Sequence, residues 1–281
     1  MQSSGPSLSL FGGVFLRSPD GSPAALPGRK TQRLLAMLAL GPARGLCRES
    51  LAEALWPGAD PTSSRKALAT ELWRLRATLS AAGLQSWLMT DNGRVGLSET
   101  ARTSTDVAAF EAALALARTG SSKEQERALA SAEALYTGEF MAGDADEWCI
   151  GRRAYYAALH ADLHFIGIRR AREAADWVEV IRHGQALAEA EPLFEEAQQE
   201  LMRAHLALGN RPAALAVYRS LELALADELG LKPSEETRHL RLAALPPRFS
   251  PRRADASASL ADRLRGIASE IERLEAMRPR T

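Results

Sequence analysis

The apolar and polar positions divide the chain into a short β-prone start, a group of three helices and a longer helical region. Leu8 to Leu16 alternates loosely around Gly12-Gly13, which indicates a strand with a bulge or a short hairpin. Helical patterns bounded by proline and glycine follow over 29–40, 48–56 and 64–79.

The segment 64–79 has a leucine stripe on one side and cations on the other. Its leucines recur at spacings of four, three and four, which at 100° per residue gives one narrow face: Leu68, Leu72, Leu75 and Leu79. The other side carries Lys66, Thr70, Trp73, Arg74 and Ala77. Ser63 or Ser64 is expected to cap this helix. The pattern predicts a helix that buries its leucines and offers positive charge outward.

Two β-prone runs, 87–90 and 95–97, flank Asp91-Asn92-Gly93, and Asn-Gly between such runs is a strong hairpin signal. Strands, three helices and a hairpin, with a proline-rich turn before the third helix, predict a winged helix-turn-helix domain over residues 1–100. Residues 98–106 are expected to form a polar connection.

From 106 to 245 the pattern is helical, and two turns contain nearly the same arrangement of proline and acidic residues. Pro192 and Pro233 each precede acidic pairs and lie 41 residues apart, longer than the 34 of a strict tetratricopeptide repeat (TPR). Ala214 and Tyr218 fit the second-helix pattern of that repeat. We therefore predict a TPR-like all-α helical repeat domain over 104–245. The fold class is mainly α with a small β part.

Residues 246–281 are expected to form a linker and a C-terminal amphipathic helix over 259–277. Its apolar residues follow a seam of two heptads: Leu260, Leu264, Ile267, Ile271 and Leu274. Two heptads are too short to hold a coiled coil alone. Docking onto the repeats and pairing with a second chain both stay open.

The composition indicates a cellular compartment, and the charges are distributed unevenly along the chain. The chain is 46% hydrophobic and 25% charged, as in ordinary globular proteins. Two distant cysteines exclude a disulfide framework and favour a reducing cytoplasm, and no apolar run is long enough to span a membrane. The net charge is +4 over residues 1–100, −7 over 101–246 and +3 over 247–281. A basic start and an acidic middle indicate two domains with different partners, one of them a polyanion.

Three segments resemble the OmpR-type DNA-binding domain of SARP-like bacterial regulators: LPGRKTQRLLAMLAL, LCRESLAEALWPGADP and RKALATELWRLRATL. Three later segments resemble the bacterial transcriptional activation domain that follows the winged helix in those proteins: YTGEFMAGDADEW, EPLFEEAQQELMRAHLALGNRPAALAVY and LADELGLKPSEET. The resemblance spans roughly residues 8 to 245. Cys47 departs from it, because the family usually has serine or a similar cap before the second helix.

The resemblance implies a sequence-specific DNA-binding activator, with double-stranded DNA and RNA polymerase as partners and a homo-oligomer on DNA. It assigns base reading in the major groove to Lys66, Thr70 and Arg74. Phosphate or wing contacts are expected from further cations: Arg65, Arg76, Arg94, Arg29, Lys30 and Arg33. Trp73 either contacts a thymine methyl or a sugar, or packs against the activation domain or the N-terminal strands, and packing is preferred.

A rival function is a TPR-like protein-interaction adaptor whose winged helix is a non-reading scaffold, with the cations forming a solvated face. The cluster of cations around one helix and its wing argues against it. No catalytic constellation is found, and an enzyme is not expected. His160 and His164 lie four apart without an HExxH pattern, so they are interpreted as a polar strip on a packed helix. Neither a metal site nor a cofactor is predicted.

Overall fold

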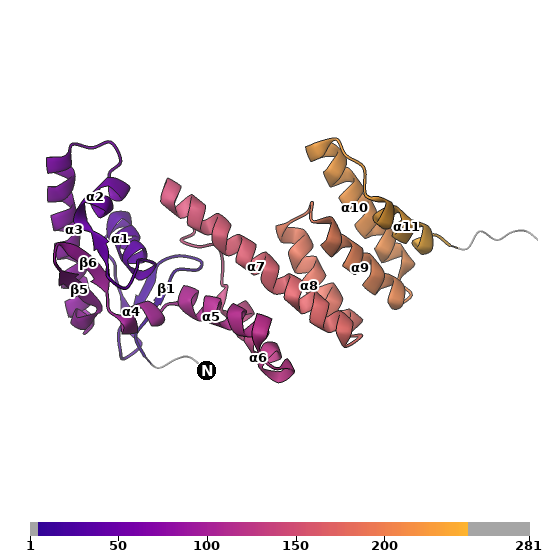
Figure 1. Ribbon diagram of the computed structural model, residues 1–281, viewed down its shortest axis with the longest axis horizontal. Helices are drawn as coiled ribbons and strands as arrows, with labels where there is room; N and C mark the ends of the chain where they lie inside the picture. Colours follow the sequence, from indigo (N-terminus) through magenta and orange to yellow (C-terminus); the bar gives the residue numbers. More distant parts are fainter. Residues whose placement is uncertain (1–4, 247–281) are drawn as a thin grey trace, which may run out of the picture.

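The computed structural model describes residues 5–246, which form an elongated molecule. Helix α3 (Pro61–Ala81) lies at one end and α10 (Arg211–Leu229) with α11 (Glu235–Ala244) at the other (Figure 1). The long helix α7 (Glu147–Glu173) runs between them. The C-terminal helix predicted over 259–277 lies outside the described residues. Between residues 5 and 246, no helix is both long and apolar enough to cross a membrane.

The chain begins with a small antiparallel sheet. Its strands are β1 (Ser7–Ser9), β2 (Phe15–Arg17) and β3 (Pro23–Ala24), in the order β1-β2-β3. Of the two predicted forms, the hairpin is the one observed: Leu8 pairs with Leu16. Gly12 and Gly13 make the connection with φ values of 74° and 151°, a region that favours glycine.

A winged helix-turn-helix follows, as the pattern predicts. Its helices are α1 (Arg29–Ala39), α2 (Arg48–Leu55) and α3, and a 3₁₀ turn, η1 (Gln85–Trp87), leads to the wing. The wing strands β5 (Leu88–Asp91) and β6 (Arg94–Leu97) pair with β4 (Leu46–Cys47) in the order β4-β6-β5. Asn92 and Gly93 both have positive φ, 46° and 76°, which matches the right-handed twist of a tight hairpin.

The predicted cap and the predicted start of α3 are both wrong. Neither Ser63 nor Ser64 caps α3: the cap is Asp60, whose carboxylate accepts a hydrogen bond from the Ser63 backbone N–H at 2.9 Å. Pro61 occupies the first helical position, where its missing N–H costs nothing, so the helix starts earlier than predicted. At the start of α2, Cys47 holds the cap position without a side-chain cap bond.

The connection 98–106 is also not a plain polar loop. It contains the short helix α4 (Glu99–Thr103), with the Ser98 hydroxyl accepting from the Ala101 N–H at 3.3 Å. Ala101 is fully buried, so the turn is fixed by packing as well as by its cap. A short helix with one buried residue has too little periodicity to be seen in the sequence.

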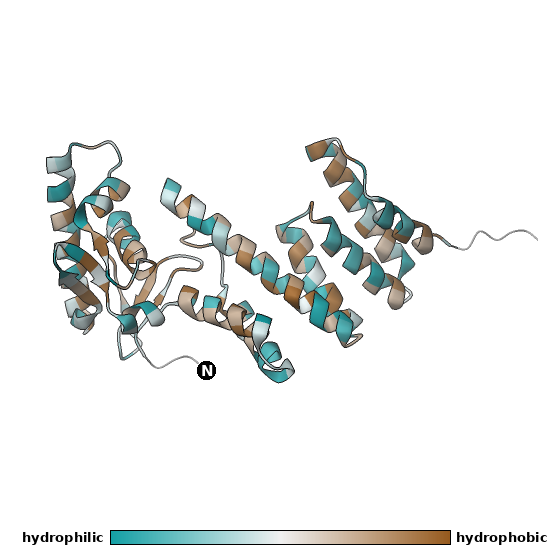
Figure 2. Cartoon of the chain, viewed as in Figure 1, coloured by the Kyte–Doolittle hydropathy of each residue, from teal (hydrophilic) through white to brown (hydrophobic). Residues whose placement is uncertain are grey.

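The rest of the described chain is helical hairpins in series, which confirms the predicted all-α repeat. In addition to α7, α10 and α11 it comprises α5 (Asp106–Thr119), α6 (Ser122–Leu135), α8 (Trp177–Ala190) and α9 (Glu195–Ala207). Apolar and polar residues alternate around these helices, as expected where each buries one face (Figure 2). The two similar turns meet, since Glu195 accepts from the Ser234 N–H at 2.7 Å.

The hydrophobic core does not stop at the boundary near residue 104. Phe11, after β1, is 1% exposed and lies edge-on to Phe110 of α5 and Tyr156 of α7, with ring centroids 5.4 and 5.3 Å apart. Phe11 also forms a β-bridge with Phe140 in the loop before α7. The winged helix and the first helices of the second region therefore share one core.

Two carboxylate contacts reinforce this junction. Asp106 accepts from the backbone N–H groups of Leu10 and Phe11, at 2.9 and 3.0 Å. Asp144 receives two N–H groups of the buried Arg33, at 2.5 and 3.2 Å, and Asp146 pairs with the same guanidinium. Burial by itself would raise the pKa of Asp144, but the hydrogen bonds and charge of Arg33 hold it below its usual value.

Candidate nucleic-acid interface

Helix α3 is two-sided, as its spacing predicts. Its four leucines are at most 3% exposed and pack onto α1 and α2: Leu68, Leu72, Leu75 and Leu79. Lys66, Thr70 and Arg74 are exposed and lie together on one outer face, because four residues make slightly more than one turn. The Thr70 hydroxyl donates to the Lys66 carbonyl at 3.2 Å. One helix thus presents a lysine, a threonine and an arginine in a row.

Glu71 lies beneath this face and binds one of its side chains. The sequence pattern does not predict this role. It is 7% exposed, and its carboxylate accepts from the Thr31 hydroxyl of α1 at 2.5 Å and from Arg74 at 2.7 Å. Thr31 is fully buried. A buried carboxylate needs such partners, because an unpaired one is costly. Glu71 therefore fixes the direction of the Arg74 guanidinium while the Arg74 side chain stays 48% exposed.

The wing lies beside the C-terminal half of α3. Arg76 of α3 is exposed and donates to the Thr90 hydroxyl of β5 at 3.4 Å. Arg94 of β6 is half-buried, and its guanidinium donates to the Gly45 carbonyl at 3.0 Å. Arg94 therefore lies against the segment before α2, while Arg76 lies between the helix and the wing.

The cations at the start of α1 separate into three environments. Arg29 is exposed. Lys30 donates to the Leu55 carbonyl and lies over the Trp56 ring, 5.4 Å from its centroid. Its positive charge therefore interacts with the C-terminal end of α2. The prediction that Arg33 offers its charge to a phosphate is wrong, because its side chain is buried in the ion pairs with Asp144 and Asp146. Arg65, at the start of α3, is exposed.

Trp73 lies on the outer side of α3 and is 67% exposed. The preferred expectation that it packs against the activation domain or the N-terminal strands is therefore wrong. The N-terminal sheet buries Leu8 and Leu16, and none of the described residues covers the indole. Tryptophan is enriched at interfaces, so the exposed Trp73 is a candidate contact residue.

The aromatic residues of the repeat differ in their burial. Tyr156 is fully buried, and its hydroxyl donates to Glu111 at 3.1 Å. Tyr155, its neighbour, is 46% exposed. Three others are half-buried and pack against the hydrophobic clusters: Trp148, Phe165 and Trp177.

Comparison with known proteins identifies the helical half of this arrangement. Residues 105–245 match the Bacterial transcriptional activator domain. The regulatory protein AfsR of Streptomyces coelicolor is 28% identical over 247 residues, which cover 86% of this chain and 24% of AfsR. The transcriptional regulatory protein MoaR1 of Mycobacterium tuberculosis is 28% identical over 222 residues, covering 75% of this chain and 70% of MoaR1. The chain spans about a quarter of the length of AfsR.

A solved structure matches the whole described fold. Mycobacterium tuberculosis EmbR, in complex with a low affinity phosphopeptide, superposes with a TM-score of 0.71 at 22% identity. The match covers 95% of this chain and 71% of EmbR. At this identity the likeness concerns the fold: a small β part and winged helix followed by a helical region.

Proposed function

The chain belongs to the SARP-like bacterial transcriptional regulators, and we propose that it is a sequence-specific, DNA-binding activator of transcription. Helix α3 enters the major groove of double-stranded DNA in the bacterial cytoplasm. The repeat domain holds a second copy of the chain on the DNA and contacts RNA polymerase. The relatives are regulators, not enzymes, and the proposed role is non-catalytic.

The outer face of α3 is the observation that carries this proposal. Lys66, Thr70 and Arg74 are exposed on a helix whose other side is held by buried leucines. The major groove of B-DNA admits one α-helix, and arginine and lysine read guanine there while methyl groups meet thymine. Arg74, aimed by Glu71, is the strongest candidate for a base contact. Arg65 and Arg76 flank it and are proposed to contact phosphates.

Trp73 and the wing complete the proposed surface. The exposed indole of Trp73 is suited to a thymine methyl or a sugar. Arg94 and Lys30 are tied to backbone carbonyls of the winged helix, so we expect smaller contributions from them than from Arg65 and Arg76. Arg29 is exposed at the start of α1 and is proposed as a peripheral phosphate contact.

Binding should weaken steeply with salt, because lysines and arginines that neutralise phosphates release counterions from DNA. A mobility-shift series with fragments of the chromosomal locus that encodes the protein, at increasing salt, measures this slope. Failure to retard any fragment at low salt would contradict the proposal. It would favour the rival function, a protein-interaction adaptor with a non-reading winged helix.

The variant Arg74→Ala separates base reading from phosphate contact. On the preferred site it should cost ~1–3 kcal/mol of binding free energy, with little loss on unrelated DNA, because a base contact is lost. The measurement is the dissociation constant for both DNAs at one salt concentration. Arg219→Ala, an exposed arginine on α10, is the control and should leave both constants unchanged. An equal loss on both DNAs would make Arg74 a phosphate contact.

Exposed leucines support a protein-contact role for the far end of the repeat. Four of them are more than half exposed on α10, α11 and the turn between them: Leu223, Leu229, Leu231 and Leu242. Such apolar surface is common where proteins meet partners. Leu223→Ser should weaken retention of purified RNA polymerase or self-association by sedimentation, while DNA affinity of the single chain stays unchanged.

A further inference from the structure

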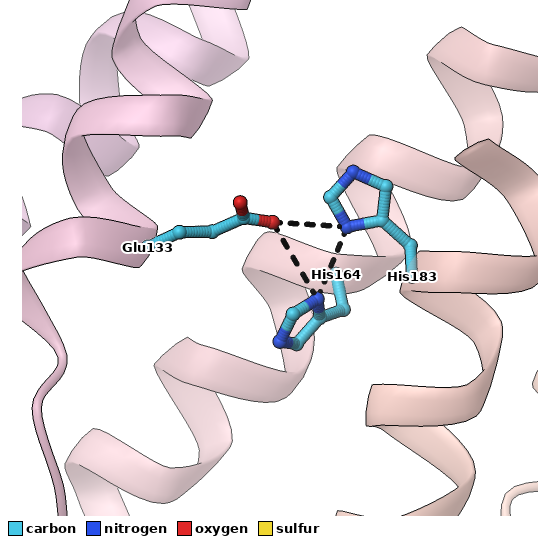
Figure 3. Close-up of side chains that lie close together, drawn as sticks. All are labelled: Glu133, His164 and His183. Carbon is cyan, nitrogen blue, oxygen red and sulfur yellow. Dashed lines mark hydrogen bonds and ion pairs between the residues drawn. The ribbon is translucent and has the colours of Figure 1, made fainter.

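Three helices bring one acid and two histidines to a single point. Glu133 comes from α6, His164 from α7 and His183 from α8, and their side chains converge (Figure 3). The two histidine Nδ1 atoms are 3.1 Å apart, and Glu133 Oε1 lies 3.2 Å from His183 Nδ1 and 3.9 Å from His164 Nδ1. Both histidines are buried, 5% and 4% exposed.

These three distances fit one metal ion. The circle through the three atoms has a radius of about 2.0 Å, which is the bond length from zinc to imidazole nitrogen and carboxylate oxygen. Two histidines and a carboxylate are also a frequent donor set for zinc and for other first-row transition metals. We propose that Glu133, His164 and His183 bind one divalent transition-metal ion of the zinc class.

Neighbouring side chains hold the proposed ligands in place. Arg182 donates to both oxygens of Glu133, at 3.0 and 3.2 Å, and directs that carboxylate to the histidines. His160 Nε2 lies 3.2 Å from His164 Nε2, so the outer nitrogen of the His164 ring is also held.

Metal binding displaces one proton. Arg182 has only donors, and its N–H lies 2.8 Å from His183 Nε2, so in the metal-free chain that nitrogen accepts and the proton of neutral His183 sits on Nδ1. The ion takes the place of this proton at Nδ1. Either the ring loses the proton to solvent and keeps its bond from Arg182, or the proton moves to Nε2. In the second case the Arg182 N–H has to turn away from Nε2, because two donors cannot bond, and Glu179, whose oxygen lies 3.9 Å from Nε2, is the nearby acceptor for the new N–H.

The chain also provides space and access. Glu133 and His183 line a surface cavity of about 460 Å³, from which an ion and a water ligand can reach the site. Gly167 of α7 faces the His183 ring, and a Cβ at that position would lie 2.4 Å from His183 Nε2. Only glycine leaves room for this ring. An ion there joins α6 to α7 and α8, and so joins the start of the activator domain to its repeat.

The test uses the full chain, stripped with a chelator and titrated with zinc chloride. We expect one zinc per chain by elemental analysis, a raised melting temperature, and no such effect of magnesium, which prefers oxygen ligands. Glu133→Gln, His164→Gln and His183→Gln should each abolish the bound equivalent. His239→Gln, an exposed histidine on α11, is the matched control and should retain it.

A measurement on the unaltered chain covers the case in which a variant fails to fold. On adding zinc, the imidazole nitrogen resonances of two histidines should shift. Gly167→Ala should weaken zinc binding at least tenfold while keeping all three ligands. The proposal is overturned if the unaltered chain binds no zinc, if its histidine resonances do not respond, or if folded variants of the three ligands keep the bound equivalent.

Discussion

Glu71 shows what a local pattern omits at the scale of single residues. The leucine spacing of α3 predicts which positions face outward, and Lys66, Thr70 and Arg74 do so. It cannot predict that Glu71 is buried, because its partner Thr31 is 40 residues away. The same limit explains why Lys30, whose partner is the Leu55 carbonyl, looked like a free charge. Apolar periodicity predicts which side chains are exposed, whereas the partners of a side chain depend on the tertiary fold.

The histidine cluster also depends on residues that lie far apart in the sequence. The sequence pairs His160 with His164 by their spacing, yet the metal ligand set proposed for this chain uses only His164 of the two. Glu133 and His183 come from other helices, 31 and 19 residues away. No short motif spans such distances, so the absence of HExxH had no bearing on this site.

Asp106 should make stability depend on pH. Desolvation raises its pKa to about 6 in spite of its backbone hydrogen bonds, so the folded state favours the protonated form. Its stabilising contribution is fully present below pH ~4 and is lost as pH rises through ~6, by up to ~2–3 kcal/mol. Urea unfolding of the chain and of Asp106→Asn between pH 4 and 7 measures it. The difference between the two free energies of unfolding should change with pH.

Asp227→Asn, an exposed carboxylate on α10, serves as the control and should follow the parent chain at every pH. If the difference for Asp106→Asn is the same at pH 4 and pH 7, the carboxyl group is not titrating in this range.

At the scale of elements, long helices and the wing were predictable because each has a strong local signal. Apolar periodicity identifies α3, and Asn92-Gly93 identifies the wing hairpin. The helix α4 was missed because five residues are too few for a period to show. The start of α3 was misplaced because three candidate caps, Asp60, Ser63 and Ser64, stand close together and only geometry distinguishes them.

The cap of α3 can be tested directly. Asp60→Ala removes the acceptor for the Ser63 N–H and should lower the free energy of unfolding by ~1 kcal/mol. Ser63→Ala keeps that N–H, and its effect should stay within ~0.5 kcal/mol. Thermal or urea unfolding of both variants gives the comparison. A larger loss for Ser63→Ala than for Asp60→Ala would assign the cap to the serine.

At the scale of the whole molecule, the sequence predicts the order of the two regions, but it does not predict that they share one hydrophobic core. The charge asymmetry and the family resemblance both separate a basic start from an acidic helical region. Neither indicates that Phe11 bridges to Phe140 or that Arg33 reaches Asp144, because those partners lie more than 100 residues apart. Contacts from the repeat domain therefore stabilise the winged helix that is proposed to bind DNA.

Arg33→Met should test how much this junction contributes. It leaves the buried carboxylate of Asp144 and the partly exposed one of Asp146 without their shared ion pair, which should cost ~3–5 kcal/mol of unfolding free energy. Arg29→Met, one turn earlier on α1 and exposed, should stay within ~0.5 kcal/mol. Chemical denaturation of both variants measures the difference. Equal, small effects would mean that the pair is solvated and that the junction rests on apolar packing alone.

The shared core also constrains how such proteins evolve by recombination. A crossover at residue 104 that moved residues 105–245 onto a different DNA reader would leave Phe110 and Tyr156 without Phe11, and Asp106 without its two backbone donors. A viable exchange has to carry the strand pair β1–β2 along with the activator domain. The packed unit in this chain is consequently the whole span from the first strand to α7, which extends beyond the segment 105–245 that the family model matches.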